Sequence, residues 1–280
     1  MIEVLPDKSV LVDCGPMRMV LRAFVHGQPV TDLAQRGGAK ALEVLAEQAR
    51  FLPLLKQKAL GLDPDVDWPE VVRNMIGATR SMGEGDLTPL AAVAGAAADV
   101  VAHFIYRLGA TKVLADNGGD LAIRLRPGES VVVGVKTTVA ARRPTYALEI
   151  DPQMGVGGVA TSGLGGRSFT KGIASAVTIL AESASLADAA ATVVANATNV
   201  DHPSIRRALA DTIYPDTDLV GEPVTTEVGE LPPEKIREGL EKGLAKADSL
   251  RDQGWIRGAL IVIHGRVAVT KALIPRVRAL

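Results

Sequence analysis

The sequence has only one cysteine, Cys14, among its 280 residues. A single cysteine cannot form an intramolecular disulfide, so we expect a protein of the reducing cytoplasm. Aromatic residues make up only 3% of the chain, which leaves few flat side chains for stacking against single-stranded nucleic acid. The formal net charge is -1, so no broad basic surface is expected either. These scarcities argue against nucleic acid as the main partner.

Long uncharged hydrophobic runs are also missing. The most apolar stretch, residues 90–105, is short for a membrane span and contains Asp99, so we interpret it as a buried helix. Residues 1–7 mix acidic and apolar side chains, unlike a secretory signal peptide. The four histidines have neither the spacing of a metal site nor a cysteine partner. We therefore expect neither a membrane anchor nor a zinc site of the histidine and cysteine type.

Hydrophobic residues make up 47% of the chain, enough for a full core. Runs rich in β-prone residues between turn signals predict strands at residues 9–12, 17–25, 112–115, 120–125, 130–136, 146–150, 174–180, 255–263 and 266–270. Helical spacing or helix-start signals predict helices at 39–55, 88–108, 185–197, 205–212 and 233–251, with irregular chain at 62–85. This order predicts an α+β fold with a largely antiparallel sheet. No linker marks a boundary, so we expect one domain over residues 1–280, with two packed halves at about 1–135 and 136–280.

Residues 157–166 concentrate glycine around two hydroxyl groups, those of Thr161 and Ser162. Glycine allows positive φ and a close approach of the backbone to a ligand. Successive free N–H groups in such a loop can form a concavity that binds anions. We interpret the segment as the floor of a phosphate or nucleotide site. The alternative is a loop that only turns the chain.

Two alanine-rich helices each carry one aspartate, Asp99 and Asp188. A lone carboxylate on a helix usually faces solvent, and we expect this of Asp99, with a position facing a site as the alternative. Asp188 follows Ser185 by three residues. This spacing is an acidic variant of the capping box, which would explain the carboxylate as part of a helix cap without a binding or catalytic role. Asp188 and Thr192 are also four residues apart, so they share a helix face and could share a Mg²⁺ ion. The similar settings of the two aspartates suggest a duplicated β–α unit.

Four segments of the chain match a known family in content and in order. They are Gly95 with Asp99, residues 117–120, residues 158–163 and residues 187–192. Together they resemble the ApbE-like superfamily, whose best-known members are FAD:protein FMN transferases, and most closely its short branch found in bacteria and archaea. The resemblance is strongest over residues 86–200 and extends more loosely over the whole chain.

The resemblance implies a T-fold-like architecture with two central alanine-rich helices, FAD or FMN in a central cleft, and Mg²⁺ near the phosphates. It assigns contacts with the flavin nucleotide to Asn117, Gly118, Gly119, Asp120, Thr161, Ser162 and Gly163. It assigns the role of cation ligands to Asp188 and Thr192. The cationic residues Arg167 and Lys171 follow the glycine-rich segment, and we expect them to hold phosphate groups.

The chain departs from the transferases of this family in one segment. They carry a histidine and an Asp-Pro pair where residues 164–173 of this chain have neither histidine nor aspartate. Ala94 stands where the family usually has lysine, and Ser175 stands where the short branch often has aspartate. Activation of an acceptor hydroxyl therefore lacks a candidate base, and no catalytic residue is assigned.

We therefore expect a cytoplasmic protein that binds a flavin or related phosphorylated ligand with Mg²⁺. Three questions stay open at this point. One is whether it acts as an FMN transferase on a protein acceptor. Another is whether it is instead a non-catalytic accessory protein, for example in sulfur assimilation into homocysteine. The third is whether it forms a homodimer, with which its extended edge strands are compatible.

Overall fold

The computed structural model describes residues 1–138, 141 and 143–280. The chain divides into two compact units. Unit 1 comprises Met1–Val131, Ile150–Ala160 and Leu180–Ala189, and unit 2 comprises Val132–Glu149, Thr161–Ile179 and Ala190–Leu280. Strands β9 (Gly158–Ser162) and β10 (Ala176–Ala181) and helix α5 (Ala184–Ala197) each contribute residues to both units. The single domain expected over residues 1–280 stays a prediction.

Unit 1 contains an antiparallel sheet with the strand order β1-β2-β3-β5-β6. Its strands are β1 (Ile2–Val4), β2 (Val10–Cys14), β3 (Met17–Val25), β5 (Lys112–Asn117) and β6 (Asp120–Leu125), with the short β4 (Gln28–Pro29) beside β3. Strand β6 pairs with β9, where Leu121 lies opposite Val159. The strands predicted on either side of Gly15 and of Gly118 are confirmed and pair as hairpins, and both glycines have positive φ.

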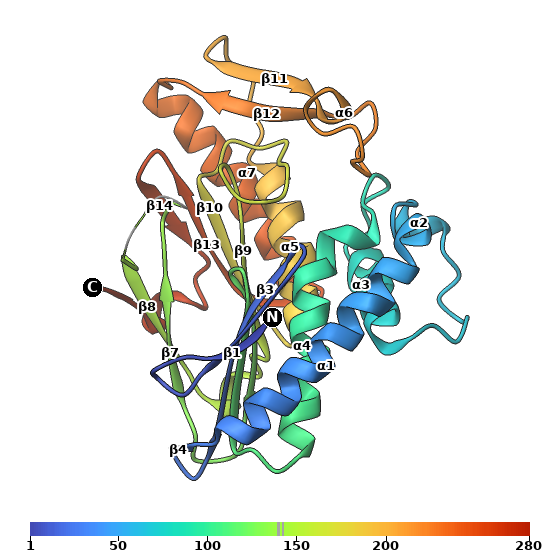
Figure 1. Cartoon of the computed structure of the whole chain (residues 1–280). Coiled ribbons are helices and arrows are strands. Elements are labelled where there is room, and N and C mark those ends of the chain that lie inside the picture. Colours follow the sequence, from blue (N-terminus) through green and yellow to red (C-terminus); the bar gives the residue numbers. More distant parts are fainter. Residues whose placement is uncertain (139–140, 142) are drawn as a thin grey trace. The chain divides into compact units, whose positions relative to one another are not determined.

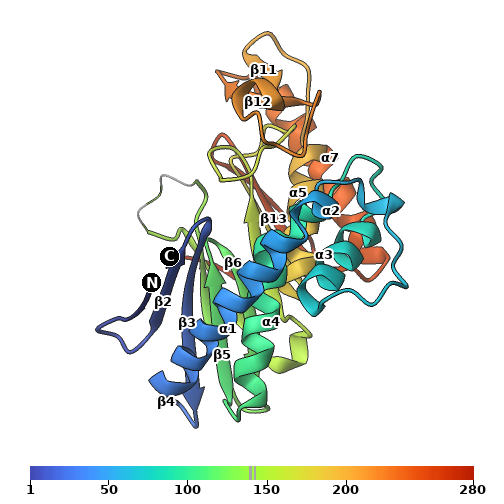
Figure 2. The same cartoon turned by 45° about the vertical axis from the view of Figure 1, so that its right-hand side comes forward.

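Helices cover one face of this sheet, as Figures 1 and 2 show. Helix α1 (Thr31–Arg50) packs on β2 and β3, and α4 (Val93–Arg107) packs on β5 and β6. Helix α3 (Glu70–Ser81) contacts both α1 and α4. Shorter turns are α2 (Leu52–Leu55), η1 (Ala59–Gly61), η2 (Pro89–Ala92) and η3 (Pro152–Met154). The large side chains of Leu21, Met75 and Ile105 are fully buried between these layers, each contributing roughly 1.5–3 kcal/mol.

Unit 2 contains the antiparallel hairpin of β13 (Ile256–Ile263) and β14 (Arg266–Val269), on which α7 (Pro233–Asp252) packs. Strands β11 (Ile205–Leu209) and β12 (Pro223–Val228) form a separate two-stranded sheet, and α6 (Ala210–Ile213) follows β11. A third sheet has the order β15-β8-β7, from β15 (Val277–Ala279), β8 (Tyr146–Ile150) and β7 (Val131–Val135). The turn η4 (Ile274–Arg276) leads into β15.

Three helix predictions differ from the structure. Helix α1 begins at Thr31 and not at residue 39, and it runs through Gly37 and Gly38. A Cβ on Gly37 would lie 2.4 Å from Ile105 Cδ1, so glycine lets α1 pack closely on the Ile105 side chain of α4, and this packing outweighs its low helix propensity. Helix α3 lies inside the stretch 62–85, which was predicted to be irregular. The apolar residues of α3 have helical spacing. The Pro- and Asp-rich chain before them led to the prediction of irregular structure for the whole stretch.

The helix predicted at 205–212 is wrong over most of its length, because residues 205–209 form strand β11. This strand exists through its antiparallel pairing with β12, in which Ile205 lies opposite Val228. Pairing with a distant segment outweighs local helix propensity. Only the four residues of α6 are helical.

Among the described residues, the stretch Pro89–Arg107 alone has the length and apolarity of a membrane-spanning helix. Within its most apolar window, 61% of the residues are buried in the protein, and Ala97, Val101 and Ile105 belong to the core of unit 1. This burial is that of a core helix, which agrees with the interpretation of residues 90–105.

Candidate functional site

Asp99 lies on α4 with only 4% of its surface exposed. Its Oδ1 accepts hydrogen bonds from the Ala184 N–H at 3.0 Å and from Arg124 Nη2 at 2.9 Å, and its Oδ2 accepts one from the Ser185 N–H at 2.8 Å. Ala184 and Ser185 are the first residues of α5, so this carboxylate caps a helix other than its own. The expected solvent-facing position of Asp99 is wrong, because two helix N–H groups and a guanidinium replace the water.

Arg124 is the partner that the sequence pattern did not identify. Besides Asp99, it donates from Nη1 to the carbonyl oxygens of Ile123 and Gly157, both at 2.9 Å. Arg124 therefore ties β6, α4 and the segment before β9 together within unit 1. The available signal was a basic residue inside a strand that packs on a helix carrying a buried carboxylate.

Asp188 lies on α5 and is partly buried. Its Oδ2 accepts a hydrogen bond from the Gly95 N–H at 2.9 Å, and the Ala94 N–H also donates to this carboxylate. Both N–H groups belong to the first turn of α4. On α5 itself, the Leu186 N–H donates to Ser183 Oγ at 3.2 Å. The predicted capping box ending at Asp188 is therefore wrong, because Asp188 caps α4.

The two aspartates are placed reciprocally. Asp99 of α4 binds the N-terminus of α5 at Ala184, and Asp188 of α5 binds the N-terminus of α4 at Gly95. Gly95 and Ala184 are 89 residues apart (184 − 95), and so are Asp99 and Asp188 (188 − 99). The similarity of the two alanine-rich segments thus corresponds to equivalent positions in the structure.

Gly95 marks the point where α4 and α5 come closest. A Cβ on Gly95 would lie 2.2 Å from the Ala184 carbonyl oxygen and 2.9 Å from Asp188 Cβ, so only glycine fits. Asn117, at the end of β5, is buried and donates from Nδ2 to the Ala94 carbonyl oxygen at 3.2 Å. The structure therefore brings Asn117 and Asp188 together around Ala94, as two of the predicted site residues.

The turn after Asn117 has a structural role of its own. Gly118 and Gly119 have φ values of 74° and 112°, and the Gly119 N–H donates to Asp116 Oδ1 at 2.9 Å. Both glycines are exposed, and they provide the positive φ that a tight hairpin needs. Asp120 is partly buried at the start of β6. A ligand contact by Gly118, Gly119 or Asp120 stays a prediction.

The glycine-rich segment is used for close backbone packing. A Cβ on Gly158 would lie 2.2 Å from Ala184 Cα, and one on Gly163 would lie 2.9 Å from the carbonyl oxygens of Ala174 and Ser175. Thr161 Oγ1 is hydrogen-bonded to Thr178 Oγ1 at 2.9 Å, and Ser162 ends β9. These contacts explain Gly158 and Gly163 without a ligand, and the phosphate floor stays a prediction.

The backbone after this loop has its N–H groups already bonded. The N–H of Lys171 donates to Asn196 Oδ1 at 2.9 Å, and that of Gly172 donates to Thr170 Oγ1 at 3.1 Å. The next two, of Ile173 and Ala174, both donate to Thr198 Oγ1. N–H groups with internal acceptors cannot line an anion concavity. A phosphate contact by residues 171–174 would therefore come from side chains.

The two predicted phosphate-binding cations differ in their surroundings. Lys171 Nζ is paired with Glu222 Oε2 at 2.6 Å, and both side chains are partly buried. Arg167 is exposed. The segment 161–171 belongs to unit 2, whereas Asn117, Asp120 and Asp188 belong to unit 1. A joint contact of these segments with one ligand stays a prediction.

Asp188 and Thr192 are the residues predicted to hold a cation. Within the ranges 1–138, 141 and 143–280, no group of three or more His, Cys, Asp or Glu side chains could hold a metal ion. Mg²⁺ is usually held by one or two protein groups together with water and substrate phosphates. Asp188 of unit 1 and Thr192 of unit 2 lie one turn apart along α5 and are both partly buried. That they hold a cation together stays a prediction.

Asp188 should make stability depend on pH when no divalent cation is bound. Burial raises the pKa of Asp188 from its ordinary value of 3.8 to about 7. Hydrogen bonds from the Gly95 and Ala94 N–H groups lower this pKa in part, and the negative charge of Asp99 raises it further. Between these two pKa values the folded protein binds more protons than the unfolded chain, so its free energy of unfolding falls as pH rises. Near pH 8, Asp188→Asn should raise that free energy by something on the order of 1–3 kcal/mol.

Urea unfolding of both proteins in EDTA would measure this effect. Near pH 5 the wild-type carboxyl group is already protonated, so the two midpoints should differ little there. A wild-type protein that is the more stable of the two near pH 8 would contradict the raised pKa.

The comparisons with known proteins agree with this fold. A family model described as "AbpE bacteria" matches residues 2–269. A UPF0280 protein of Methanococcoides burtonii is 34% identical over 196 residues, which are 69% of this chain and 79% of that protein. A UPF0280 protein of Methanopyrus kandleri is 45% identical over 146 residues, 50% of this chain and 55% of that protein. The chain thus spans about half the length of the second relative.

Two solved structures share the fold. The flavinyl transferase ApbE from Pseudomonas stutzeri has a TM-score of 0.53 at 15% identity, over 99% of this chain and 97% of that chain. A mutant of the flavin transferase ApbE from Vibrio cholerae has a TM-score of 0.53 at 12% identity, over 96% and 98% of the two chains. The predicted α+β, ApbE-like fold with mostly antiparallel sheets is confirmed. The chain therefore belongs to the bacterial AbpE family and, with it, to the ApbE-like superfamily.

Proposed function

We propose that this chain binds a flavin nucleotide or a related phosphorylated ligand together with a divalent cation, and that Asp188 and Thr192 hold the cation. The observation that carries the proposal is the placement of Asp188. Its carboxylate is fixed by the Gly95 N–H at 2.9 Å, so it is oriented before any ligand arrives. Thr192 presents a hydroxyl oxygen one turn further along the same face of α5.

The donor chemistry supports Mg²⁺ more than a softer metal. Carboxylate and hydroxyl oxygens are hard ligands, whereas zinc and copper sites use sulfur or imidazole nitrogen. A Mg²⁺ ion held here would neutralise phosphate charge and orient the phosphate groups. The flavin part of the proposal comes from the family, since the two solved neighbours are named as flavin and flavinyl transferases.

The proposal stops at binding and does not include transfer to an acceptor protein. Residues 164–173 offer no histidine or aspartate as a base, and Lys171 in this segment is paired with Glu222. Ser175 Oγ donates to the carbonyl oxygens of Thr137 at 3.2 Å and of Val262 at 3.1 Å, which is a structural role. We place the binding activity in the cytoplasm, in keeping with the single cysteine.

Thermal unfolding with FAD or FMN, with and without Mg²⁺, tests the proposal. We expect flavin and Mg²⁺ together to raise Tm by about 5 °C or more at saturating ligand, and either alone to raise it less. Asp188→Asn should abolish the Mg²⁺-dependent part of the rise. Thr192→Val, which keeps the side-chain shape but removes the hydroxyl, should reduce it.

The matched control is Asp32→Asn, which neutralises an exposed carboxylate on α1 and should leave the ligand-induced rise unchanged. A wild-type Tm that responds to neither flavin in the presence of Mg²⁺ would rule the proposal out. A full response in Asp188→Asn would remove Asp188 as the cation ligand.

A further inference from the structure

Two exposed surfaces of unit 2 carry opposite charges and exposed apolar side chains. We propose that the first surface of one copy of this chain docks onto the second surface of another copy. The first is named the acidic tip and comprises residues 209–222, from the end of β11 through α6 to the start of β12. The second is named the basic face and comprises Val132, Ala147, Glu149 and residues 271–280, on and beside the three-stranded sheet of β15, β8 and β7. This inference is independent of ligand binding.

The acidic tip combines negative charge with exposed apolar groups. It contains four acidic residues and neither lysine nor arginine, although the whole chain has a net charge of only -1. One of the four, Glu222, is paired with Lys171. Four large apolar side chains in the same segment are exposed: Leu209, Ile213, Tyr214 at 57% and Val220 at 70%. Exposed apolar side chains in a segment of one charge sign are typical of a protein interaction site.

The acidic tip is also held in one conformation. The Ala210 N–H donates to the Glu222 carbonyl oxygen at 3.0 Å, which closes the segment at its two ends. The Gly221 N–H donates to Asp211 Oδ1 at 2.8 Å, and the Tyr214 N–H donates to the Ala210 carbonyl oxygen at 2.9 Å. A loop ordered before binding loses less conformational entropy when it docks.

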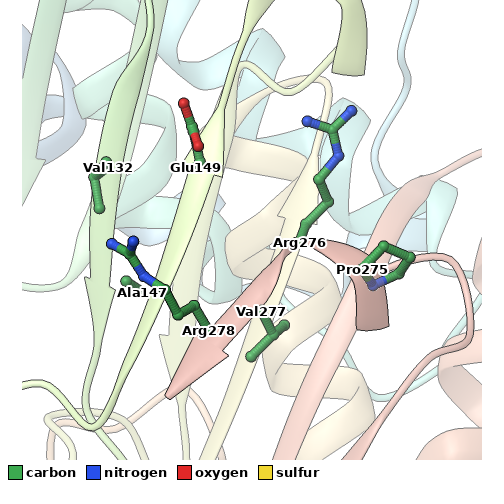
Figure 3. Close-up of a pocket in the computed structure, with 7 residues that line it drawn as sticks. All are labelled: Val132, Ala147, Glu149, Pro275, Arg276, Val277 and Arg278. Atoms are coloured by element: carbon green, nitrogen blue, oxygen red, sulfur yellow. The ribbon is translucent and has the colours of Figure 1, made fainter. Parts of the chain in front are cut away.

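The basic face surrounds a hollow of about 370 Å³, shown in Figure 3. Val132, Ala147 and Val277 contribute apolar atoms to it, and Arg276, Arg278 and Glu149 bring charge. Just beyond it, Ile274 and Leu280 are exposed. Residues 271–280 contain three basic side chains and no acidic one. Two arginines line the hollow against one carboxylate, so an apolar side chain accompanied by negative charge is the ligand that suits it best.

The two surfaces complement each other in both respects. An aromatic side chain such as Tyr214 would fill the hollow, as anchor residues of interfaces do, while Asp216 and Asp218 would face Arg276 and Arg278. We assign this contact to two copies of the chain, with the acidic tip of one copy meeting the basic face of the other. Because both surfaces are small and charged, we expect the association to be weak and sensitive to salt.

Sedimentation velocity of the intact chain over a range of concentrations tests this inference. We expect the average mass of the wild type to rise above 29.3 kDa with concentration at low salt, and to fall back towards it at high salt. Asp216→Lys with Asp218→Lys reverses the acidic tip, and Arg276→Glu with Arg278→Glu reverses the basic face. Each double variant alone should sediment as a monomer, whereas an equimolar mixture of the two should associate again.

A variant of equal charge change separates surface docking from net charge. Glu234→Lys with Glu241→Lys changes two exposed residues of α7 and should associate like the wild type. Circular dichroism and Tm would show that each variant is folded. The inference is overturned by a wild type that keeps the mass of one chain at every concentration and salt, by reversed variants that associate like the wild type, or by a mixture that stays monomeric.

Discussion

Replacing Asp99 by asparagine is expected to lower the free energy of unfolding by about 3 kcal/mol or more. The substitution keeps the size of the side chain but leaves the Arg124 guanidinium without its buried counter-charge. It also replaces a charged acceptor by a neutral one for the N–H groups of Ala184 and Ser185 at the start of α5. Urea unfolding followed by circular dichroism would measure the loss.

A neutralised carboxylate in an exposed pair is the control. Glu227 on β12 is paired with Arg206 on β11, and Glu227→Gln should change stability little, because water screens exposed pairs. In a double-mutant cycle, Asp99→Asn with Arg124→Met should cost clearly less than the sum of the two single changes. Strict additivity would mean that the Asp99–Arg124 bond is not the source of the effect.

Gly95→Ala is the second substitution with a large expected effect. The new Cβ would lie 2.2 Å from the Ala184 carbonyl oxygen, so α4 and α5 would have to separate. Separation lengthens the Gly95–Asp188 and Ala184–Asp99 hydrogen bonds together, and we expect a loss of about 3 kcal/mol or more in the free energy of unfolding. Thermal and urea unfolding would both report it.

A Gly→Ala substitution at a position with room for the new Cβ should have the opposite effect on the free energy of unfolding. Gly77 lies inside α3, is exposed, and has no atom within 4 Å of an added Cβ. Gly77→Ala should therefore raise the free energy of unfolding by about 0.5–1 kcal/mol through helix propensity alone. If Gly95→Ala proved as stable as the wild type, the close crossing at Gly95 would be refuted.

Much of the secondary structure could be predicted from local patterns. The strands on either side of Gly118 and the helix α7 depend on signals within a few residues of each other, and both predictions are confirmed. Strand β11 could not be predicted, because its stability depends on pairing with β12, more than ten residues further along. Gly37 and Gly38 misled the prediction for α1 because their function, close packing on other elements, is not visible in a local window.

The site was predictable as residue types but not as contacts. The sequence pointed to Asp99 and Asp188 because both interrupt alanine-rich helices, yet it offered two local explanations and neither described their partners. Each carboxylate binds the N-terminus of the other helix, a relation that requires knowledge of how α4 and α5 cross. Arg124 was missed for the same reason. The role of this strand residue depends on its ion pair with the buried Asp99, which the sequence does not show.

The mutual capping of α4 and α5 also bears on how the chain folds during synthesis. The donor Gly95 and the acceptor Asp188 are separated by 93 residues, so α4 leaves the ribosome well before the carboxylate that completes its first turn. At about 5–20 residues per second, the delay is roughly 5–20 s. During that interval α1 and the first strands can cover the apolar face of α4. The N–H groups at the end of the helix near Gly95 still lack their acceptor, the Asp188 carboxylate. Nascent chains stalled between residues 131 and 184 should therefore be protease-sensitive at this end of α4.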